Sequence, residues 1–398
     1  MNNKLGIKMA IGAICFVNLL YMVPSVAVSG MVAAFHDQPQ SKVLLLLTLP
    51  NLTGIIGVLA EPFLERWLSR KHICLMALSF FLVPGAISFV VHNQLDVLVA
   101  CSVFMGIAYG LQSTVFPLVV SSYFNEPKRS QVMGIATGAM QFGRMATTLV
   151  AGVLAGFEWY MVYLCFAVVL VPMVLVYFCL PGEKKGQQSE EGHQRDAVCM
   201  PGVIRLALVG FCFASFYFVV NTHTSLYIEE NSLGGTAVTG VVTAVGSIAA
   251  TVVAAAFGWL QRYTGRYTMA ASLLVTGVGY LISTVWVSLP GAIAAMVGAS
   301  AGIGLFCPCL MVGFARYSSG RYLSIVTSAV LTVVNVGYFV SPYLVEWVAS
   351  PLGNSAQMIF ATAGGLALAV AAVSAIANWK APLQSVDTQV RTATEVEV

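Results

Sequence analysis

Residues 127–156 read PKRSQVMGIATGAMQFGRMATTLVAGVLAG, and nearly every residue after Arg129 is apolar or small. Arg144 is the exception. At 1.5 Å per residue it lies roughly 20 Å along a helix, near the middle of a bilayer core about 30 Å thick. A guanidinium stays charged at that depth and needs a polar partner, so an arginine there is a candidate functional residue. The stretch therefore predicts a membrane-spanning helix built around Arg144.

The composition excludes a soluble protein. Charged residues make up 9% of the 398 residues, whereas about 25% is usual in soluble proteins, and 58% of the chain is hydrophobic. The mean hydropathy is +0.85. A soluble chain of this length could not cover its surface with so few charges, so the sequence predicts an all-α polytopic membrane protein. The nine cysteines lie mostly within apolar runs and are interpreted as packing residues, so neither a metal nor a cofactor is expected.

Apolar runs long enough to cross a bilayer recur about twelve times. They lie near residues 8–34, 43–65, 73–91, 96–122, 132–156, 160–180, 203–227, 236–260, 268–287, 291–315, 323–346 and 355–379. Of the 19 Lys and Arg residues, all except Lys42 and Arg144 fall on one side of this pattern. The positive-inside rule assigns that side, and both termini, to the cytoplasm. We therefore expect a multi-pass protein of the cytoplasmic (inner or plasma) membrane.

The longest polar stretch, PGEKKGQQSEEGHQRDAVCMPG at residues 181–202, divides the spans into six and six. It is interpreted as a cytoplasmic linker. The prediction is therefore an N-terminal six-helix bundle at residues 1–180 and a C-terminal six-helix bundle at residues 203–380, related by pseudo-symmetry. Residues 381–398 are polar and lack periodicity, and they are predicted to form a disordered cytoplasmic tail.

This organisation resembles the major facilitator superfamily over about residues 5–380. After the second span, that family typically has Gly, three residues, Asp-Arg, one residue, Gly and then basic residues. Residues 61–71 read EPFLERWLSRK, which keeps the acidic and basic positions, whereas Glu61 and Leu68 replace the glycines. The resemblance implies a gate latch formed by Glu65, Arg66 and Arg70, with Arg266 in the equivalent loop of the second half. The alternative is a loop that only carries cytoplasmic charge.

Two departures from the family bear on function. Ser102 stands where the family's proton-coupled drug exporters have an arginine in the fourth span, and Thr147-Thr148 replaces their Gly-Pro element in the fifth. Both departures argue against drug/proton antiport. The subfamily is not identified.

Transporters built from internal repeats place their binding site near the midplane, where the repeats meet. A shift of about 194 positions aligns residues 141–144, QFGR, with residues 335–338, NVGY. Gln141 then corresponds to Asn335, and Arg144 to Tyr338. If the two spans are equivalent, Arg144 and Tyr338 face each other across a cavity. Chance similarity between two glycine-rich helices is the alternative.

Other polar residues reach a comparable depth, where they either bind substrate or join helices through hydrogen bonds. The further candidates for substrate binding are Asn18, Tyr21, Asn51, Gln112, Tyr217 and Asn221. His223 is the candidate for proton coupling.

One arginine among amides, hydroxyls and aromatic rings suits a small ligand with one anionic group. A carboxylate is the natural choice, because arginine binds it through a bidentate fork. The leading hypothesis is a secondary transporter for a small organic anion, such as a monocarboxylate or an amino-acid-like solute, that works by alternating access. Alternatively, Arg144 is a structural clamp on helix-end carbonyls or on a neighbouring carboxylate.

Other functions stay open on the same fold. An aromatic cavity would favour an exporter of amphipathic or drug-like compounds, and a non-transporting membrane sensor is less favoured. No paired catalytic residues occur at depth, so an enzyme is not expected. The expected partners are the small-molecule substrate, the lipid bilayer and either protons or a counter-substrate. We expect no nucleic-acid partner and a monomeric chain.

Overall fold

The computed structural model of the protein describes residues 3–123, 128–180, 197–319, 321–353 and 355–380. The predicted tail at residues 381–398 lies outside these ranges, as does most of the predicted linker at residues 181–202. Packing divides the chain into two compact units. Unit 1 comprises Met1–Gly186, Asn221–Ile248 and Val287–Ile293, and unit 2 comprises Gln187–Val220, Ala249–Trp286 and Ala294–Val398. The predicted division by chain order, at residues 1–180 and 203–380, stays a prediction.

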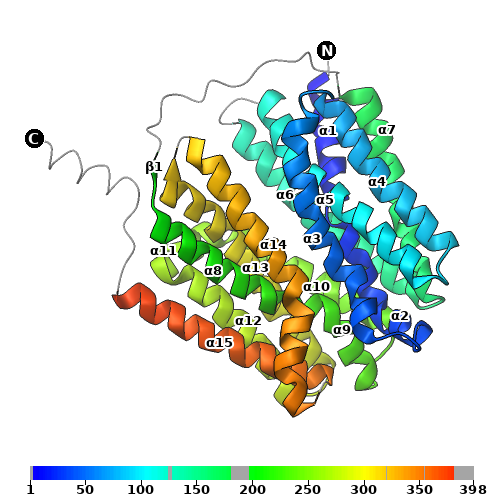
Figure 1. The fold of residues 1–398 in the computed structure, drawn as a ribbon, viewed down its shortest axis with the longest axis vertical. Helices are drawn as coiled ribbons and strands as arrows, with labels where there is room; N and C mark the ends of the chain where they lie inside the picture. Colours follow the sequence, from blue (N-terminus) through cyan, green and yellow to red (C-terminus); the bar gives the residue numbers. More distant parts are fainter. Residues whose placement is uncertain (1–2, 124–127, 181–196, 320, 354, 381–398) are drawn as a thin grey trace, which may run out of the picture. The chain divides into compact units, whose positions relative to one another are not determined.

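Unit 1 is built from helices (Figure 1). Its elements are α1 (Asn3–Phe16), the 3₁₀ helix η1 (Leu20–Ala27), α2 (Val28–Ala34), α3 (Gln40–Leu64), α4 (Arg70–Val90), α5 (Leu95–Tyr123), α6 (Lys128–Ala155), the 3₁₀ helix η2 (Trp159–Val169) and α7 (Leu170–Cys179), with most of α9 (Val219–Glu230) and the first part of α10 (Thr236–Ala255).

Unit 2 contains the rest of α10, most of α13 and two strands of two residues that pair antiparallel. Its elements are β1 (Ala197–Val198), α8 (Met200–Tyr217), α11 (Phe257–Thr264), η3 (Gly265–Tyr267), α12 (Thr268–Val285), α13 (Leu289–Tyr317), β2 (Ser318–Ser319), α14 (Arg321–Ala349), η4 (Ser350–Leu352) and α15 (Ala356–Lys380).

Eleven helical segments of the described residues are long and apolar enough to cross a membrane. The helix that carries Arg144, α6, is not among these eleven, although its 28 residues give about 42 Å at 1.5 Å each. With α6 the structure has the predicted number of spans, about twelve. The predicted all-α polytopic membrane fold is therefore confirmed.

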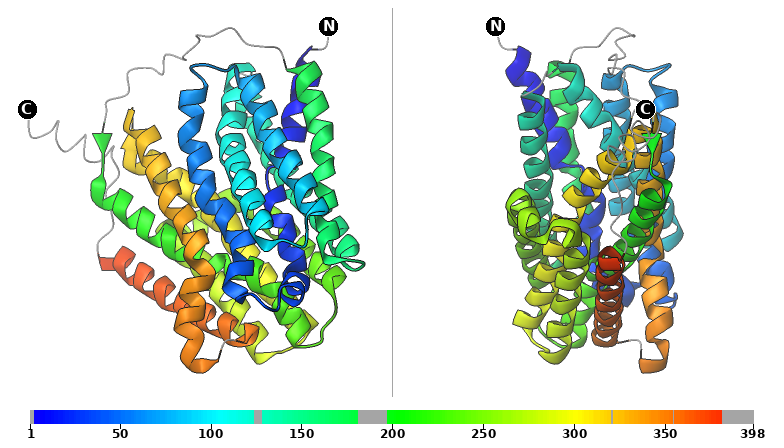
Figure 2. Two further views of the ribbon diagram at one scale, coloured as in Figure 1. Left: turned by 45° about the vertical axis from the view of Figure 1, so that its right-hand side comes forward. Right: turned by 90° about the vertical axis from the view of Figure 1, so that its left-hand side faces the viewer.

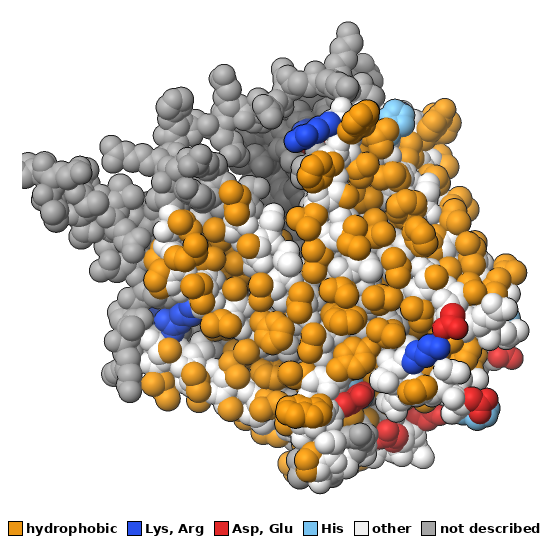
Figure 3. Space-filling model, in the orientation of Figure 1, with side chains coloured by type: hydrophobic (Ala, Val, Ile, Leu, Met, Phe, Trp, Pro, Cys, Tyr) orange, Lys and Arg blue, Asp and Glu red, His pale blue; other side chains and the backbone are white. Residues whose placement is uncertain are grey.

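Apolar side chains face outward along these helices. Figure 3 shows hydrophobic side chains over most of the described surface on one face, with few charged side chains among them. Ile56, Leu59, Val83 and Val90 are each more than half exposed. So large an apolar surface would promote aggregation in water, whereas in a bilayer it contacts lipid.

Glycines allow the closest helix contacts in each unit. In unit 1, α3 and α5 pack along each other (Figure 2), and a methyl group on Gly110 would overlap the carbonyl group of Gly54. In unit 2, a methyl group on Gly279 of α12 would come within 2.9 Å of the Cα atom of Gly298 on α13. Small residues favour such approaches because lipid supplies no hydrophobic force between helices, so van der Waals contact has to hold them together.

Several spans consist of more than one helical segment, and two of these interruptions bear on the site. In the first, α1 ends at Phe16 and the chain continues through η1, which contains Pro24. In the second, α8 ends at Tyr217 and α9 begins at Val219. Breaks inside a membrane leave backbone groups that need other partners, and the break after α8 has one in Tyr280 of α12. The fully buried Tyr280 hydroxyl accepts a hydrogen bond from the Val220 N–H (3.2 Å) and lies 3.0 Å from the Phe216 carbonyl.

Candidate functional site

Arg144 is buried inside unit 1, with 5% of its surface exposed. The preceding residue, Gly143, lets α6 pack closely against α1, because a methyl group there would overlap the backbone carbonyl of Phe16. This close contact fixes the position of Arg144. The next turn of α6 adds hydroxyl contacts. Thr147 Oγ1 donates to the Gly143 carbonyl (2.6 Å), and Thr148 Oγ1 donates to the Arg144 carbonyl (2.8 Å). The guanidinium therefore projects from a tightly packed part of α6.

Asn221 contacts the guanidinium directly. Nη2 of Arg144 donates a hydrogen bond of 2.7 Å to Oδ1 of Asn221, which lies on α9 just after the interrupted part of the span. Asn221 is 4% exposed. An amide oxygen carries no net charge, so this bond orients the guanidinium without neutralising it. The structure thus brings together two of the predicted substrate-binding residues, which are 77 positions apart in the sequence.

Three further predicted residues are amides of unit 1, of which Asn18 and Gln112 are buried and Gln141 is half-buried. Gln112 of α5 donates from Nε2 to the Ile14 carbonyl of α1, two residues before the Phe16 contact with α6. Asn18 follows α1, and Gln141 lies one turn before Arg144. Among the described residues, Asn18 Nδ2, Gln112 Oε1 and Gln141 Oε1 have no hydrogen-bond partner. Buried polar atoms of this kind are uncommon in folded proteins, and they suit a place that water or a ligand occupies.

Tyr21 and Asn51 form a pair in which the Tyr21 hydroxyl donates to Asn51 Oδ1 at 3.1 Å. Asn51 Nδ2 donates to the Leu47 carbonyl of its own helix (3.3 Å), and the Tyr21 ring packs on Tyr109 with 4.5 Å between ring centroids. Both Asn51 amide atoms therefore have a partner. Within unit 1 this pair joins η1 to α3.

Two predicted substrate-binding residues of unit 2, Tyr217 and Tyr338, lie in an aromatic region. The Tyr217 and Tyr338 rings meet edge-on with 6.1 Å between centroids, and Phe218 is 5.6 Å from Tyr338. Asn335 Nδ2 donates to the Leu331 carbonyl on its own helix (3.0 Å). Because Arg144 and Tyr338 belong to different units, their predicted meeting across a cavity stays a prediction.

His223 lies two residues after Asn221 on α9 and is fully buried. Its Nδ1 atom lies 2.8 Å from Oγ1 of Thr222. The predicted role in proton coupling stays a prediction.

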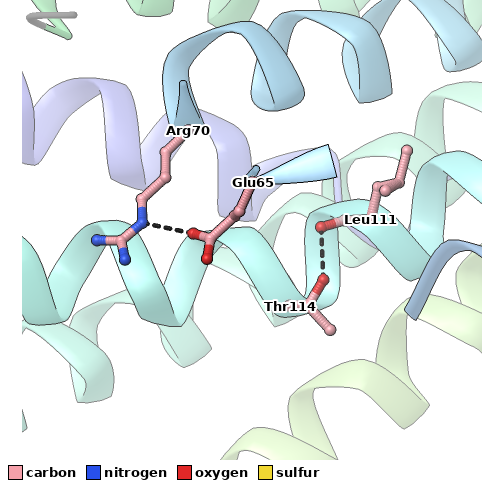
Figure 4. Close-up of polar contacts among 4 residues, drawn as sticks. All are labelled: Glu65, Arg70, Leu111 and Thr114. Carbon is pink, nitrogen blue, oxygen red and sulfur yellow. Dashed lines mark hydrogen bonds and ion pairs between the residues drawn. The ribbon is translucent and has the colours of Figure 1, made fainter. Parts of the chain in front are cut away.

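The predicted gate loop contains an ion pair. Figure 4 shows the Arg70 and Glu65 side chains pointing toward each other, with 2.7 Å between Nε and Oε1. The same view shows Thr114 of α5, whose hydroxyl donates to the Leu111 carbonyl (3.0 Å). Arg66 is exposed, and its guanidinium lies 5.4 Å from the centroid of the Phe63 ring. The structure therefore favours Arg70 over Arg66 as the basic partner of Glu65.

Arg266, the predicted gate residue of the second half, contacts its neighbour in the chain. Its Nη2 atom donates to the Tyr267 hydroxyl (2.9 Å), and its guanidinium lies 5.0 Å from the centroid of the Tyr267 ring. Its predicted role as a gate is not tested by these contacts.

Sequence reasoning missed Tyr280, because its hydrogen-bond partners, Val220 and Phe216, lie in a different span.

Comparisons with known proteins agree with this architecture. A family model described as Major Facilitator Superfamily matches residues 9–267, about two thirds of the chain. No curated protein matches the chain.

Several solved transporters share the fold. A POT family transporter in complex with 5-aminolevulinic acid is 11% identical, with 94% of this chain and 96% of that chain covered and a TM-score of 0.78. A D-xylose-proton symporter is 15% identical, with 92% and 96% covered and a TM-score of 0.70. A bacterial homologue of the human lysosomal transporter Spinster, inward-facing and unoccupied, is 13% identical, with 94% and 96% covered and a TM-score of 0.75. At these identities the likeness shows the fold alone, but the family match spans more than half of the sequence, so the chain belongs to the major facilitator superfamily.

Proposed function

We propose that this secondary transporter moves a small organic anion, a monocarboxylate or an amino-acid-like solute, across the cytoplasmic membrane by alternating access. Transport as such follows from the family. The substrate class rests on one observation, the buried Arg144 held by the neutral Asn221. A permanent positive charge at that depth is costly, and an anionic ligand would lower the cost.

The type of anion follows from the shape of arginine. The guanidinium carries five N–H donors in a planar fork that matches a carboxylate bidentately. The amides Asn18, Gln112 and Gln141 each have a buried polar atom without a hydrogen-bond partner among the described residues, and these atoms could bind the rest of a small polar solute. Asn221 would keep the fork oriented between transport cycles. Proton coupling through His223 and exchange against a counter-substrate both fit this arrangement.

The experiment that tests this proposal is uptake into proteoliposomes from a panel of labelled monocarboxylates, amino acids, sugars and amphipathic cations. Uptake of a carboxylate, competed by other carboxylates but not by sugars, is the expected result. Transport of amphipathic cations with no response to carboxylates would favour the drug-exporter alternative and contradict the anion proposal.

We also propose that both termini lie in the cytoplasm, because the basic residues lie on one side of the spans. Single cysteines in an otherwise cysteine-free protein report this. A cysteine in place of Asp37, whose side chain is 84% exposed, should react with a membrane-impermeant maleimide added outside intact cells. A cysteine in place of Ser189 should react only after the cells are opened. Labelling in the reverse pattern would contradict the orientation.

The proposed gate latch is the ion pair between Glu65 and Arg70. The two side chains are 31% and 24% exposed, so water screens their attraction and the pair stabilises one conformation only modestly. Arg70→Ala should therefore change the transport rate by up to about fivefold and leave substrate affinity unchanged. Arg66→Ala is the matched control, because it removes the same charge from the same loop. If both substitutions change the transport rate equally, the loop only carries cytoplasmic charge and the gate latch is wrong.

A further inference from the structure

Glu61 is a buried carboxyl group that the proposed gate latch does not use. It lies in the last turn of α3 and is 4% exposed. Among the described residues, its Oε1 atom has no hydrogen-bond partner, and the ion pair of the loop is made by Glu65 instead. An ionised carboxylate without a partner is costly to bury, whereas the neutral acid carries no charge. The position therefore suits a carboxyl group that holds a proton.

The helix packed along α3 brings no countercharge to Glu61. One turn before Glu61, a methyl group on Gly57 would overlap the Ile107 carbonyl of α5, so the two backbones are in close contact there. Residues 111–116 of α5 follow this contact and carry no titratable side chain, and the only charged residue of α5, Asp96, lies near its opposite end. On this side, close packing excludes water and no cation replaces it.

The other elements that pack on α3 are η1 and α2, and neither contains a charged residue. Their only titratable side chain is Tyr21, which donates its hydrogen bond to Asn51. Asn51 lies about 15 Å along α3 from Glu61, at 1.5 Å per residue. Groups that interact with the Glu61 carboxyl group therefore have to come from the turn after α3 and from α4.

A cluster of polar groups at the start of α4 faces Glu61. Glu65, one turn further along the chain, lies within hydrogen-bonding reach of the Glu61 carboxyl group. Arg70 and the Cys74 thiol, both of α4, lie close enough to interact with it electrostatically. Arg70 Nε, however, donates to Glu65 Oε1 at 2.7 Å (Figure 4). The cation of the cluster is thus paired with Glu65.

Two neighbouring carboxylates can share one proton. Carboxylate oxygens only accept hydrogen bonds, so Glu61 and Glu65 can bond to each other only when one of them is protonated. If both were ionised, their like charges would repel each other across this short distance. The ion pair with Arg70 uses the charged form of Glu65, which leaves the proton to Glu61.

Glu65 also gives Glu61 a route to water. Its side chain is 31% exposed, and the four residues between the two positions span about 6 Å of helix. By the charge pattern of the loops, this end of α3 faces the cytoplasm. A proton on Glu61 therefore exchanges with cytoplasmic water past Glu65 and does not have to cross the apolar part of the span.

We propose that Glu61 is a proton-binding site that couples the gate loop to cytoplasmic pH. The carboxyl group holds its proton while α5 and the Glu65–Arg70 pair enclose it. When the loop opens and water reaches Glu61, the proton passes to cytoplasmic water and the carboxylate stays behind. Low pH then favours the enclosed arrangement and high pH the open one. This inference rests on the proposed gate latch and on alternating access, but not on which substrate is transported.

Infrared difference spectroscopy of the purified full-length protein tests the site without any substrate. Above about pH 6, where exposed Asp and Glu side chains are ionised, we expect the carbonyl stretch of one protonated carboxyl group that disappears as the pH rises further. Glu61→Gln should lose this band, and Glu61→Asp should keep it at a shifted frequency. Glu65→Gln changes the hydrogen-bond acceptor and should also shift it. Glu158→Gln is the matched control, because Glu158 is an exposed glutamate of unit 1, and it should leave the band unchanged.

Turnover in proteoliposomes then tests the coupling. The parent's turnover should vary with pH on the side of the gate loop, and Glu61→Gln should lose that dependence. A parent spectrum without the band, or a band that persists in Glu61→Gln, overturns the proton site. The same pH profile in the parent and in Glu61→Gln overturns the coupling. Failure of Glu61→Gln to fold also counts against the site, because glutamine matches the neutral acid in size and charge. If the anion proposal fails in the uptake panel, the infrared result still stands.

Discussion

Arg144→Gln is expected to weaken binding of an anionic substrate by roughly 10- to 150-fold. A charge-assisted hydrogen bond contributes about 1.5–3 kcal/mol, and each 1.36 kcal/mol is a factor of ten. Glutamine keeps a polar group beside Asn221 and removes the charge, so the helix contacts of α6 should survive. The measurement is ligand-dependent thermal stabilisation of purified protein, with a substrate found in the uptake panel.

Three comparisons make this prediction sharper. Arg144→Lys keeps the charge without the planar fork and should also bind much more weakly. Tyr338→Phe should cost less, because a neutral hydroxyl is a weaker ligand for an anion. Asn221→Ala removes the partner that orients the fork. It should weaken substrate binding more than Tyr338→Phe does and less than Arg144→Lys does. If the substrate stabilises Arg144→Gln as strongly as the parent, Arg144 is a structural clamp and the anion proposal is wrong. Failure of Arg144→Gln and Arg144→Lys to fold would favour the same clamp.

Gly110→Ala is expected to destabilise unit 1 by about 1–3 kcal/mol, the cost of overpacking a close contact. The added methyl group would overlap the carbonyl carbon and oxygen of Gly54 on α3. A backbone group cannot rotate away as a flexible side chain can, so α3 and α5 would have to separate along their contact. The thermal unfolding temperature in detergent measures this loss of stability. A variant that cannot be purified in the folded state would show the largest loss.

Gly12→Ala is the matched control for that substitution. Gly12 also lies in a helix of unit 1, but a methyl group there meets nothing within 4 Å. Since alanine favours helix over glycine by about 0.8–1 kcal/mol, Gly12→Ala should leave the protein as stable as the parent or slightly more so. Equal unfolding temperatures for Gly110→Ala and Gly12→Ala would show that α3 and α5 are not held at the distance that the structure gives.

The spans could be predicted from the sequence because each one is a long apolar run. The run predicted at residues 132–156 corresponds to α6 (Lys128–Ala155). The first predicted span is interrupted in the structure, and Pro24 is the local signal for that interruption. The break between Tyr217 and Val219 has neither proline nor glycine beside it. Its partner, Tyr280, lies about 60 residues further along the chain, so no local pattern could reveal it.

The candidate site shows the same limit. Depth along an apolar run identifies Arg144 and Asn221 as buried polar residues, but it cannot say that they form a hydrogen bond. The gate loop is similar, because spacing alone leaves Arg66 and Arg70 as equivalent partners for Glu65. The turn between α3 and α4 decides between them, by bringing Arg70 Nε to within 2.7 Å of the carboxylate. Contacts across helices and turns depend on packing, which one sequence does not encode in any short pattern.

The backbone contact between Gly143 and Phe16 also bears on how the transporter would select its substrate. A guanidinium on a mobile loop loses up to about 2 kcal/mol of side-chain entropy when it is ordered by a ligand. Arg144 lies on α6, which packs closely against α1, and Asn221 already orients its guanidinium. Most of that loss of side-chain entropy therefore occurs during folding. Such preorganisation favours ligands that match the fork as it stands. Substrates of equal charge should then be distinguished by the geometry of their anionic group, with carboxylates that present two oxygens to the fork preferred over anions that present a single acceptor.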